Sequence, residues 1–320
     1  MPNFRFRDDE LDNVVTAVLG FQKLNASAAA KKELSGERAS IERGRRIVKD
    51  HNCQGCHVIE GFGGSIRSLA ADPSLAPPVI QGEGAKVQSD WLFSFLKAPK
   101  TGQIRPWLEV HMPTFGFTDA ELNDLTRYFA YLDRAAYPFL TSEYATEPAR
   151  WAAGRKVFEV LRCRQCHPRS EQEMNAVEDK SSLAPNLQMA AKRLRHDWIN
   201  DWIRRPDEWM PGTRMPTNFP KGDTGVRTSP LGAMVDAPAF AKDRAEFAQI
   251  LGGDDAAKKF LEDPDAVTRA LRDYVWSIGI NGGTAPAGGP APAAPPETKP
   301  AAAGARASGR ASSRTAPAAP

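Results

Sequence analysis

Apolar residues recur at helical spacing along several stretches of the chain. In residues 119–132, the side chains of Leu122, Leu125 and Phe129 fall on one face of a helix. Residues 264–278 show a second pattern of this kind, and shorter ones precede each of the two cysteine pairs. The pattern therefore predicts an all-α protein.

Several features occur twice in the same order, which indicates a duplicated domain. In each copy a glycine precedes a cysteine by nine residues, an Asp-Trp pair opens a helix that stops at a proline, and Met-Pro-Thr precedes the closing helix. We predict one domain over residues 37–140 and a second over residues 145–281. The matched positions are Gly44 with Gly154, Leu75-Ala76-Pro77 with Leu183-Ala184-Pro185, Asp90-Trp91 with Asp197-Trp198, Pro99 with Pro206, and Met112-Pro113-Thr114 with Met215-Pro216-Thr217.

The N-terminus repeats the end of the first copy. Residues 1–11 share Met, Pro, two Phe, Asp, Glu and Leu in register with residues 112–122, and an amphipathic pattern follows in both. We interpret residues 1–36 as the end of a preceding repeat plus a linker, which implies an N-terminally truncated sequence. The alternative is a chance resemblance in a short amphipathic lead-in helix.

Two segments depart from the repeat. Residues 218–263 form an insertion in the second copy, rich in Gly, Asp and Pro, and we expect a long surface excursion with one short helix near residues 241–251. Residues 282–320 are dominated by Ala, Pro, Gly and Ser without periodicity, which predicts a disordered tail.

Composition narrows the classes of partner. The formal net charge of the 320 residues is +3, which gives no reason to expect a nucleic-acid partner. No apolar run is long enough to span a bilayer, and the N-terminus lacks an apolar signal segment.

All four cysteines lie in two Cys-x-x-Cys-His pentapeptides, which end at His57 and His167. This spacing puts two thiols one helical turn apart, where they reach the two vinyl groups of a haem, and the histidine then faces the iron. Cys53 and Cys56 would attach one haem, and Cys163 and Cys166 a second. The alternative is a zinc site built from the cysteine pairs, but zinc does not require the histidine in both copies.

A haem iron needs a sixth ligand, and Met112 and Met215 occupy matching places before the closing helices. Met/His ligation raises the reduction potential of a haem. Met210 is the local competitor of Met215, and an ordinary core role is the alternative for each methionine. The other histidines are His51, His111 and His196; His111 adjoins Met112 and is the one rival ligand, with a surface role expected.

Two pairs of residues are expected to support the haem sites. Pro77 and Pro185 would offer a carbonyl to the free ring nitrogen of the proximal histidine. Gly44 and Gly154 would let the first helix of each copy cross the last one closely, against Tyr128 or Tyr131 and Tyr274 or Trp276. The alternative is that these prolines and glycines only mark loops and the ends of helices.

These residues resemble the class I cytochrome c family in tandem diheme form, over residues 37–135 and 147–280. The resemblance implies small helical domains that each wrap one covalently bound haem c. It also implies a periplasmic or outer-face location beside a membrane respiratory complex.

With two protein ligands on each iron, neither site is open to a substrate. We therefore expect an electron carrier that serves redox partner proteins of a respiratory or photosynthetic chain. The alternatives are a diheme enzyme, either a peroxidase or an oxidase of sulfur compounds, and a structural or docking domain in which the insertion matters most.

Overall fold

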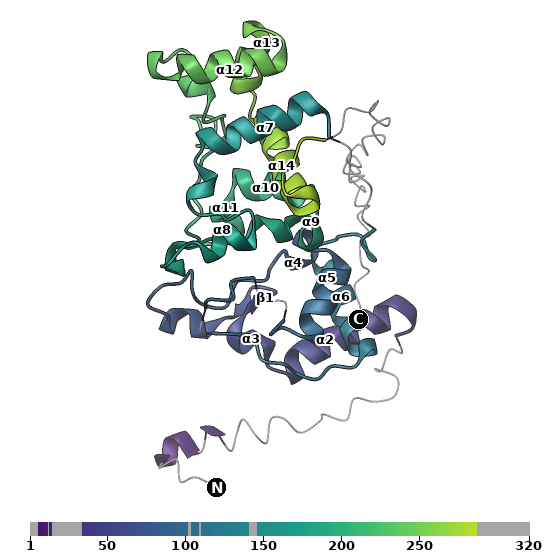
Figure 1. The fold of residues 1–320 in the computed structure, drawn as a ribbon. Coiled ribbons are helices and arrows are strands. Elements are labelled where there is room, and N and C mark those ends of the chain that lie inside the picture. Colours follow the sequence, from purple (N-terminus) through teal and green to yellow (C-terminus); the bar gives the residue numbers. More distant parts are fainter. Residues whose placement is uncertain are drawn as a thin grey trace, which may run out of the picture.

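The computed structural model describes residues 6–11, 13–14, 34–101, 104–108, 110–140 and 146–286. Within these residues the fold is mostly helical, as predicted, and its one sheet is a two-stranded antiparallel hairpin. The helices form two stacked bundles, each with its own hydrophobic core (Figure 1). No helix of the described residues is long and apolar enough to cross a membrane.

The first bundle contains the Cys-x-x-Cys-His motif that begins at Cys53. Its long helices α2 and α6 cross each other, and α5 packs on α6. Its elements are α2 (Gly36–Asp50), α3 (Cys53–Cys56), β1 (Val58–Ile59), β2 (Phe62–Gly63), η2 (Ser65–Leu69), α4 (Glu83–Lys86), α5 (Ser89–Lys97) and α6 (Asp119–Leu132).

The second bundle repeats this arrangement with α7 crossing α14. Helices α12 and α13 lie at the end farthest from the first bundle (Figure 1). Its elements are α7 (Pro148–Val160), η3 (Cys163–Gln165), α8 (Glu171–Asn175), η4 (Lys180–Ser182), η5 (Leu187–Met189), α9 (Ala190–Arg193), α10 (Trp198–Arg204), α11 (Pro206–Trp209), η6 (Gly232–Met234), η7 (Pro238–Phe240), α12 (Ala241–Leu251), α13 (Asp254–Glu262) and α14 (Pro264–Asn281).

Local sequence sets where the closing helices begin. Thr118 and Glu121 form a capping box at the start of α6, in which each side chain accepts from the other's backbone N–H. Asp263 caps α14 by accepting from the backbone of Asp265 and Ala266, with Pro264 at the first helical position. Both helices therefore begin where the sequence predicts.

Glycines allow the two helix crossings. A Cβ on Gly44 would overlap the backbone of Asp124 and the side chain of Tyr128, and one on Gly154 would overlap the carbonyl of Ala270. Tyr128 is buried and Tyr131 is exposed, so Tyr128 is the residue at the first crossing. The close helix crossings at these glycines are confirmed, but the residue that faces Gly154 is Ala270 and not Tyr274 or Trp276.

The insertion is more structured than the sequence predicts. The expected helix near residues 241–251 is α12, but α13 follows it, and Phe219, Phe247 and Leu261 are fully buried in the second core. The insertion packs against α7, where Lys156 pairs with Asp243 and Glu246. The prediction of a purely surface excursion is therefore wrong. The sequence did not reveal the buried residues, because they are too widely spaced to form a periodic pattern.

The predictions at the two ends stay predictions. Residues 8–11, 13 and 14 are helical, and the side chains of Phe6, Leu11 and Val14 are exposed. The remainder of the N-terminal partial repeat, and the tail from residue 287 onward, lie outside the described residues.

The bundles meet through an antiparallel bridge between Val87 and Leu194. The backbone N–H of Gln88 donates to the carbonyl of Arg193 at 2.9 Å, and the N–H of Arg195 donates to that of Lys86 at 2.8 Å. The two bonds are reciprocal. The interface is therefore locally close to two-fold symmetric.

Cations extend this symmetry. The Arg193 guanidinium lies 4.9 Å from the Trp91 ring centre, and the Lys86 ammonium lies 5.8 Å from that of Trp198. Each cation therefore sits over the matching tryptophan of the other bundle, a geometry in which the ring face attracts positive charge.

Candidate haem sites

The two Cys-x-x-Cys-His motifs begin with the same backbone turn. Asn52 and Arg162, which directly precede the first cysteines, are both left-handed, with φ of 50° and 55°. This turn redirects the chain from the long helix into one short helical turn. The amides of His57 and His167 then donate to the carbonyls of Cys53 and Cys163, each at 3.0 Å.

The four cysteines are free, and their exposure follows the same order in both motifs. Cys53 and Cys163 are half-buried against the two cores, whereas Cys56 and Cys166 are exposed. Burial raises the pKa of the Cys53 thiol, and it raises that of Cys163 to about 12. Each motif thus presents one thiol at the core and one at the surface, as a group seated at the edge of the core requires.

Each proximal histidine is oriented by a proline carbonyl. Nδ1 of His57 donates to the carbonyl of Pro78 at 2.8 Å, and Nδ1 of His167 donates to that of Pro185 at 2.9 Å. Nε2 is thereby left as the coordinating nitrogen. Burial lowers the pKa of both histidines, partly opposed by these carbonyls, so both favour the neutral form that binds metal.

The contact expected of Pro77 is made by Pro78 instead. The Pro77 carbonyl accepts from Nη1 of Arg67 at 2.6 Å. The sequence comparison placed Leu-Ala-Pro on Leu-Ala-Pro, whereas the structure pairs the second proline of the first copy with Pro185. A run of two prolines hides this one-residue shift, because either residue satisfies the sequence pattern.

The two methionines lie at the cores that hold the cysteines. Met112 is partly buried against the core that includes Cys53, and Met215 against the core that includes Cys163. A half-buried thioether at each core is available as a candidate sixth ligand. Met210 is half-buried at the end of α11 and does not contribute to either core.

The remaining histidines have other surroundings. His111 is exposed, and His51 lies edge-on to the rings of Phe115 and Phe117. His196 is 14% exposed and faces Asp197 and the fully buried Asp273. His196 thus belongs to a buried ion network of the second core, for which the sequence carries no signal.

The zinc alternative lacks support in the geometry. No group of three or more His, Cys, Asp or Glu side chains is placed to hold a metal ion within the part of the chain that the structure describes. Two separate thiol pairs, each beside an oriented imidazole and a half-buried thioether, match the donor set of a haem c and not that of a shared zinc.

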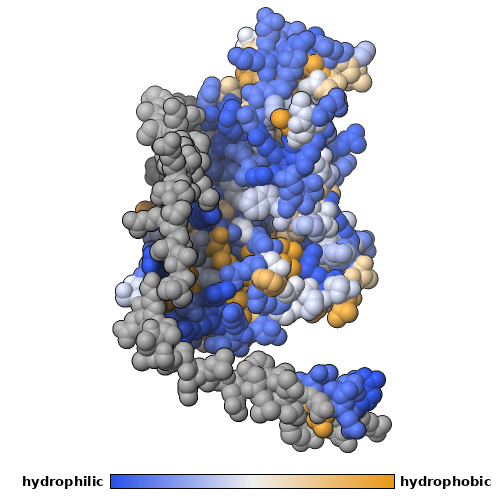
Figure 2. All heavy atoms as spheres, turned by 180° about the vertical axis from the view of Figure 1, so that it is seen from behind, coloured by the Kyte–Doolittle hydropathy of each residue, from blue (hydrophilic) through white to orange (hydrophobic). Residues whose placement is uncertain are grey.

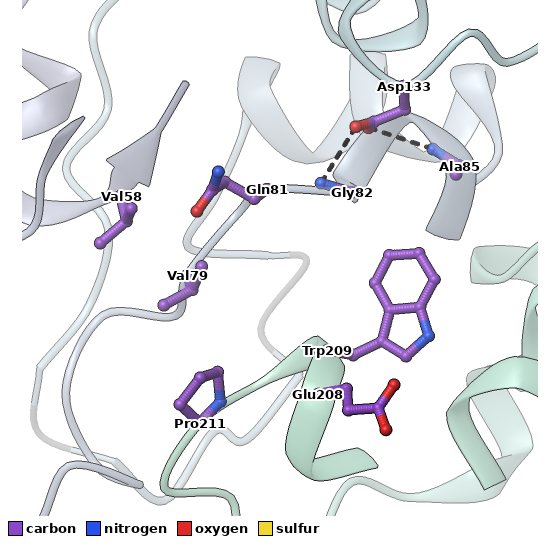
Figure 3. A pocket seen from close by; sticks show the side chains of 9 residues that line it. All are labelled: Val58, Val79, Gln81, Gly82, Ala85, Asp133, Glu208, Trp209 and Pro211. Atoms are coloured by element: carbon purple, nitrogen blue, oxygen red, sulfur yellow. Dashed lines mark hydrogen bonds between the residues drawn. The ribbon is translucent and has the colours of Figure 1, made fainter. Parts of the chain in front are cut away.

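A cavity of about 580 Å³ lies between the bundles (Figure 3). It is lined by Trp209 and Pro211 of the second bundle and by Gln81, Gly82 and Asp133 of the first. None of the cysteines, proximal histidines or methionines lines it. Val58 and Val79, which adjoin His57 and Pro78, also line it, so the cavity lies next to the first histidine's segment.

Asp133 closes one side of this cavity and holds α4 in place. Its carboxylate accepts from the backbone N–H groups of Gly82 at 3.1 Å and Ala85 at 3.3 Å (Figure 3), and also from that of Gly84 at 2.7 Å. Burial raises the pKa of Asp133, and these N–H groups oppose the rise.

A charged cluster at the interface escaped sequence analysis. Glu83 and Lys86 form a buried ion pair at 2.8 Å, and the buried Arg193 also acts on the Glu83 carboxylate. Burial raises the pKa of Glu83, but the two cations outweigh it and the net pKa is lowered. Single charged residues in short helices look solvent-exposed in a sequence, so only the packing of the bundles reveals them.

Comparisons with known proteins support the first bundle directly. The family model of cytochrome c matches residues 41–133. Comparisons with curated proteins and with solved structures found no match. The matched residues include Cys53, Cys56, His57 and Met112. The match supports a cytochrome c domain over residues 41–133, and that family implies covalently bound haem c and haem-based electron transfer.

Proposed function

We propose that this chain is a diheme c-type cytochrome that transfers electrons between redox partner proteins. The observation that carries the proposal is the repetition of the proximal geometry in the second bundle. His167 has the same donor contact to a proline carbonyl as His57, and the same left-handed turn precedes its cysteines. A second haem c is attached at Cys163 and Cys166.

The protein's part is to hold and tune the haems. The cysteine thiols would anchor the haems covalently. His57 and His167 would each supply a nitrogen ligand to an iron, and Met112 and Met215 would each supply a sulfur ligand. Such ligation favours a comparatively high reduction potential and leaves no position for substrate on either iron. An electron carrier follows from these roles, in preference to a peroxidase or an enzyme that oxidises sulfur compounds.

Exposed apolar side chains beside the first haem site suit partner docking. Phe62 and Leu69 are 71% and 83% exposed, and their segment packs on the α3 turn that carries Cys56. Figure 2 shows hydrophobic residues gathered over the lower part of the molecule, with a mostly hydrophilic surface above. An apolar patch at a haem edge is the type of surface that a transient redox partner covers.

We further propose a periplasmic or outer-face location, as a module of a membrane-associated respiratory or photosynthetic chain. This rests on covalent haem attachment, which the resemblance places outside the cytoplasmic membrane. Fractionation of cells that express the chain at its natural level tests it: recovery of the haem-stained protein in the cytoplasm would contradict this location.

Mass spectrometry of the holoprotein tests the haem count. We expect the mass of the polypeptide plus two haems, and of one haem in a Cys163→Ala/Cys166→Ala variant. The matched control is Cys53→Ala/Cys56→Ala, which should also retain one haem. A wild-type mass with a single haem, or with zinc, would refute the diheme proposal.

Ligand binding separates the carrier from the enzyme. With methionine on each iron, the ferric protein should bind cyanide or peroxide slowly, and Met112→Ala or Met215→Ala should each open one iron to fast binding. Fast peroxide binding to the unmodified protein, at a rate that matches turnover, would favour the enzyme.

A further inference from the structure

The contact between the bundles involves equivalent residues on both sides. From Pro78 to Pro99 the first bundle matches the second at a constant offset of 107 residues, so that Val87 corresponds to Leu194, and Gln88 to Arg195. The bridge therefore joins each segment to its own counterpart. These segments also begin at the two prolines that orient the proximal histidines.

In the first bundle, an unbroken series of backbone bonds leads from His57 to the interface. Nδ1 of His57 donates to the Pro78 carbonyl at 2.8 Å, and the peptide chain continues to Ile80. The Ile80 carbonyl accepts from the N–H of Glu83 at 3.3 Å, and the Glu83 carbonyl accepts from the N–H of Val87 at 3.0 Å. The N–H of Val87 and the carbonyl of Lys86 belong to the same peptide group.

In the second bundle, the same series leads from His167. Its Nδ1 donates to the Pro185 carbonyl at 2.9 Å, and the chain continues to Leu187. The Leu187 carbonyl accepts from the N–H of Ala190, and the Ala190 carbonyl accepts from the N–H of Leu194 at 2.9 Å. Each step has its counterpart in the first bundle.

Two hydrogen bonds join the two series. The N–H of Arg195 donates to the Lys86 carbonyl at 2.8 Å, and the N–H of Gln88 donates to the Arg193 carbonyl at 2.9 Å. The route from one proximal imidazole to the other therefore runs through covalent and hydrogen bonds alone, with no through-space gap.

We propose that this backbone route carries electrons between the two haem sites, from His57 to His167, and that the Lys86–Gln88 and Arg193–Arg195 segments are its crossing. Electronic coupling falls off more slowly through covalent and hydrogen bonds than through empty space. The imidazoles of His57 and His167 would connect the irons to this route, so the route would couple both haems through their histidine ligands.

The step needs no co-reactant. One electron leaves a ferrous iron, which becomes ferric, and arrives at the other ferric iron, which becomes ferrous. No bond forms or breaks, and no proton moves. This inference rests on the proposed diheme function.

The surrounding side chains keep the crossing dry and in register. Gln88 donates through its amide to the carbonyls of Ala191 and Leu194, each at 2.7 Å, and Arg195 donates to those of Val87 and Ala136. Gln88 and Arg195 are both 8% exposed. Their side chains thus hold the bridge, while their backbone N–H groups complete the route.

Proline substitution tests the crossing because proline has no backbone N–H to donate. Gln88 has a φ of −71°, close to that of proline, and Val87 and Leu194 are extended, as residues before a proline prefer. The test variant is Gln88→Pro/Arg195→Pro. Its matched control is Gln88→Ala/Arg195→Ala, which loses the same side chains but keeps both N–H groups.

The measurement is the rate of electron exchange between the haems of the holoprotein, followed optically after sub-stoichiometric flash reduction. We expect several-fold slower exchange in the proline variant than in the alanine control, with unchanged haem spectra. Single proline variants should show smaller losses, because the two crossing bonds act in parallel. X-ray scattering of both variants reports whether the bundles remain docked.

Equal exchange rates in docked proline and alanine variants would overturn the route. If the two bundles of the proline variant separate, the route is broken, and electron exchange within one molecule should disappear. Exchange that persists at a rate independent of protein concentration would overturn the proposal. A holoprotein with one haem would instead refute the diheme function, so the two failures are distinguishable by mass spectrometry.

Discussion

The two bundles share their proximal sides and differ on the opposite side. In both, the left-handed turn, the oriented histidine and the segment up to the interface have the same geometry. Met112 stands only six residues before the N-cap Thr118 of α6, whereas an insertion with two helices separates Met215 from α14. The proximal side is constrained by both cofactor and interface, while the methionine side is free to lengthen.

A second difference lies at the interface. Lys86 and Arg193 occupy equivalent positions, but Glu83 corresponds to Ala190. The buried Arg193 and Lys86, whose side chain is 13% exposed, therefore both act on one carboxylate. The near-symmetric contact is stabilised by Glu83, which has no acidic counterpart in the second bundle. Substitution of Glu83 therefore tests the difference between the bundles most directly.

The largest effect is expected from Glu83→Ala. It leaves Lys86 and Arg193 buried without their carboxylate, and loss of one partner of a buried pair costs about 3–5 kcal/mol. Chemical denaturation measures the free energy of unfolding. Adding Lys86→Met should recover part of the loss, and an equal loss in the exposed-pair control Arg46→Ala would contradict this account.

The same carboxylate predicts acid sensitivity. The pKa of Glu83 is lowered in the folded state from its ordinary value of 4.5, so its contribution is present above pH 4.5 and lost as the pH falls through the folded-state pKa. The stability difference between wild type and Glu83→Gln should therefore shrink below about pH 4.5. A difference independent of pH from 7 to 3 would sink this assignment.

Next in size are Gly154→Ala and Gly44→Ala, which test the shared helix crossings. Each Cβ would overlap a backbone carbonyl that cannot move away, so each should cost about 3 kcal/mol, at the upper end for overpacking. Gly222→Ala is the control, because its Cβ would be 3.5 Å from Thr228, an ordinary contact. Thermal unfolding that leaves all three variants alike would show that the crossings tolerate a methyl group.

A smaller effect is expected at Gly82, where the bundles differ. Gly82 is left-handed with φ of 82°, and its Cβ would overlap the Trp209 ring; the equivalent Met189 has φ of −86°. Gly82→Ala should cost about 1–3 kcal/mol. In a Trp209→Ala background the cost should fall by at least about 0.5 kcal/mol, as a double-mutant cycle reports.

The smallest effect is expected from the surface pair of Asp72 and Arg214, which also joins the bundles. Hydrogen bonds from Ser74, aided by Arg214, lower the pKa of Asp72 to about 2. Asp72→Asn should change stability only slightly, and the change should vanish at high salt. A large, salt-independent loss would mean that this contact contributes as much as the buried interface.

Local signals predicted much of the fold. Periodicity located α6 at its observed bounds, the short helix expected near residues 241–251 is α12, and the two glycines marked the helix crossings. Sequence analysis missed α13 and the burial of Phe219, and it chose Pro77 where Pro78 contacts the histidine. The burial of Phe219 depends on which residues meet across the fold, and no local pattern encodes that. The choice of Pro77 is a different error, because the constant offset of 107 residues already pairs Pro78 with Pro185.

The sequence by itself determined the chemistry, because two thiols one turn apart and a following histidine need only local spacing to present a haem-binding set. Only the tertiary structure decided how the two sites relate. The bridge of Val87 with Leu194 arises from packing between segments more than a hundred residues apart. The same packing places Arg193 near the buried Glu83 and its partner Lys86. Such contacts depend on the shapes of two finished bundles, and that information appears only once both have folded.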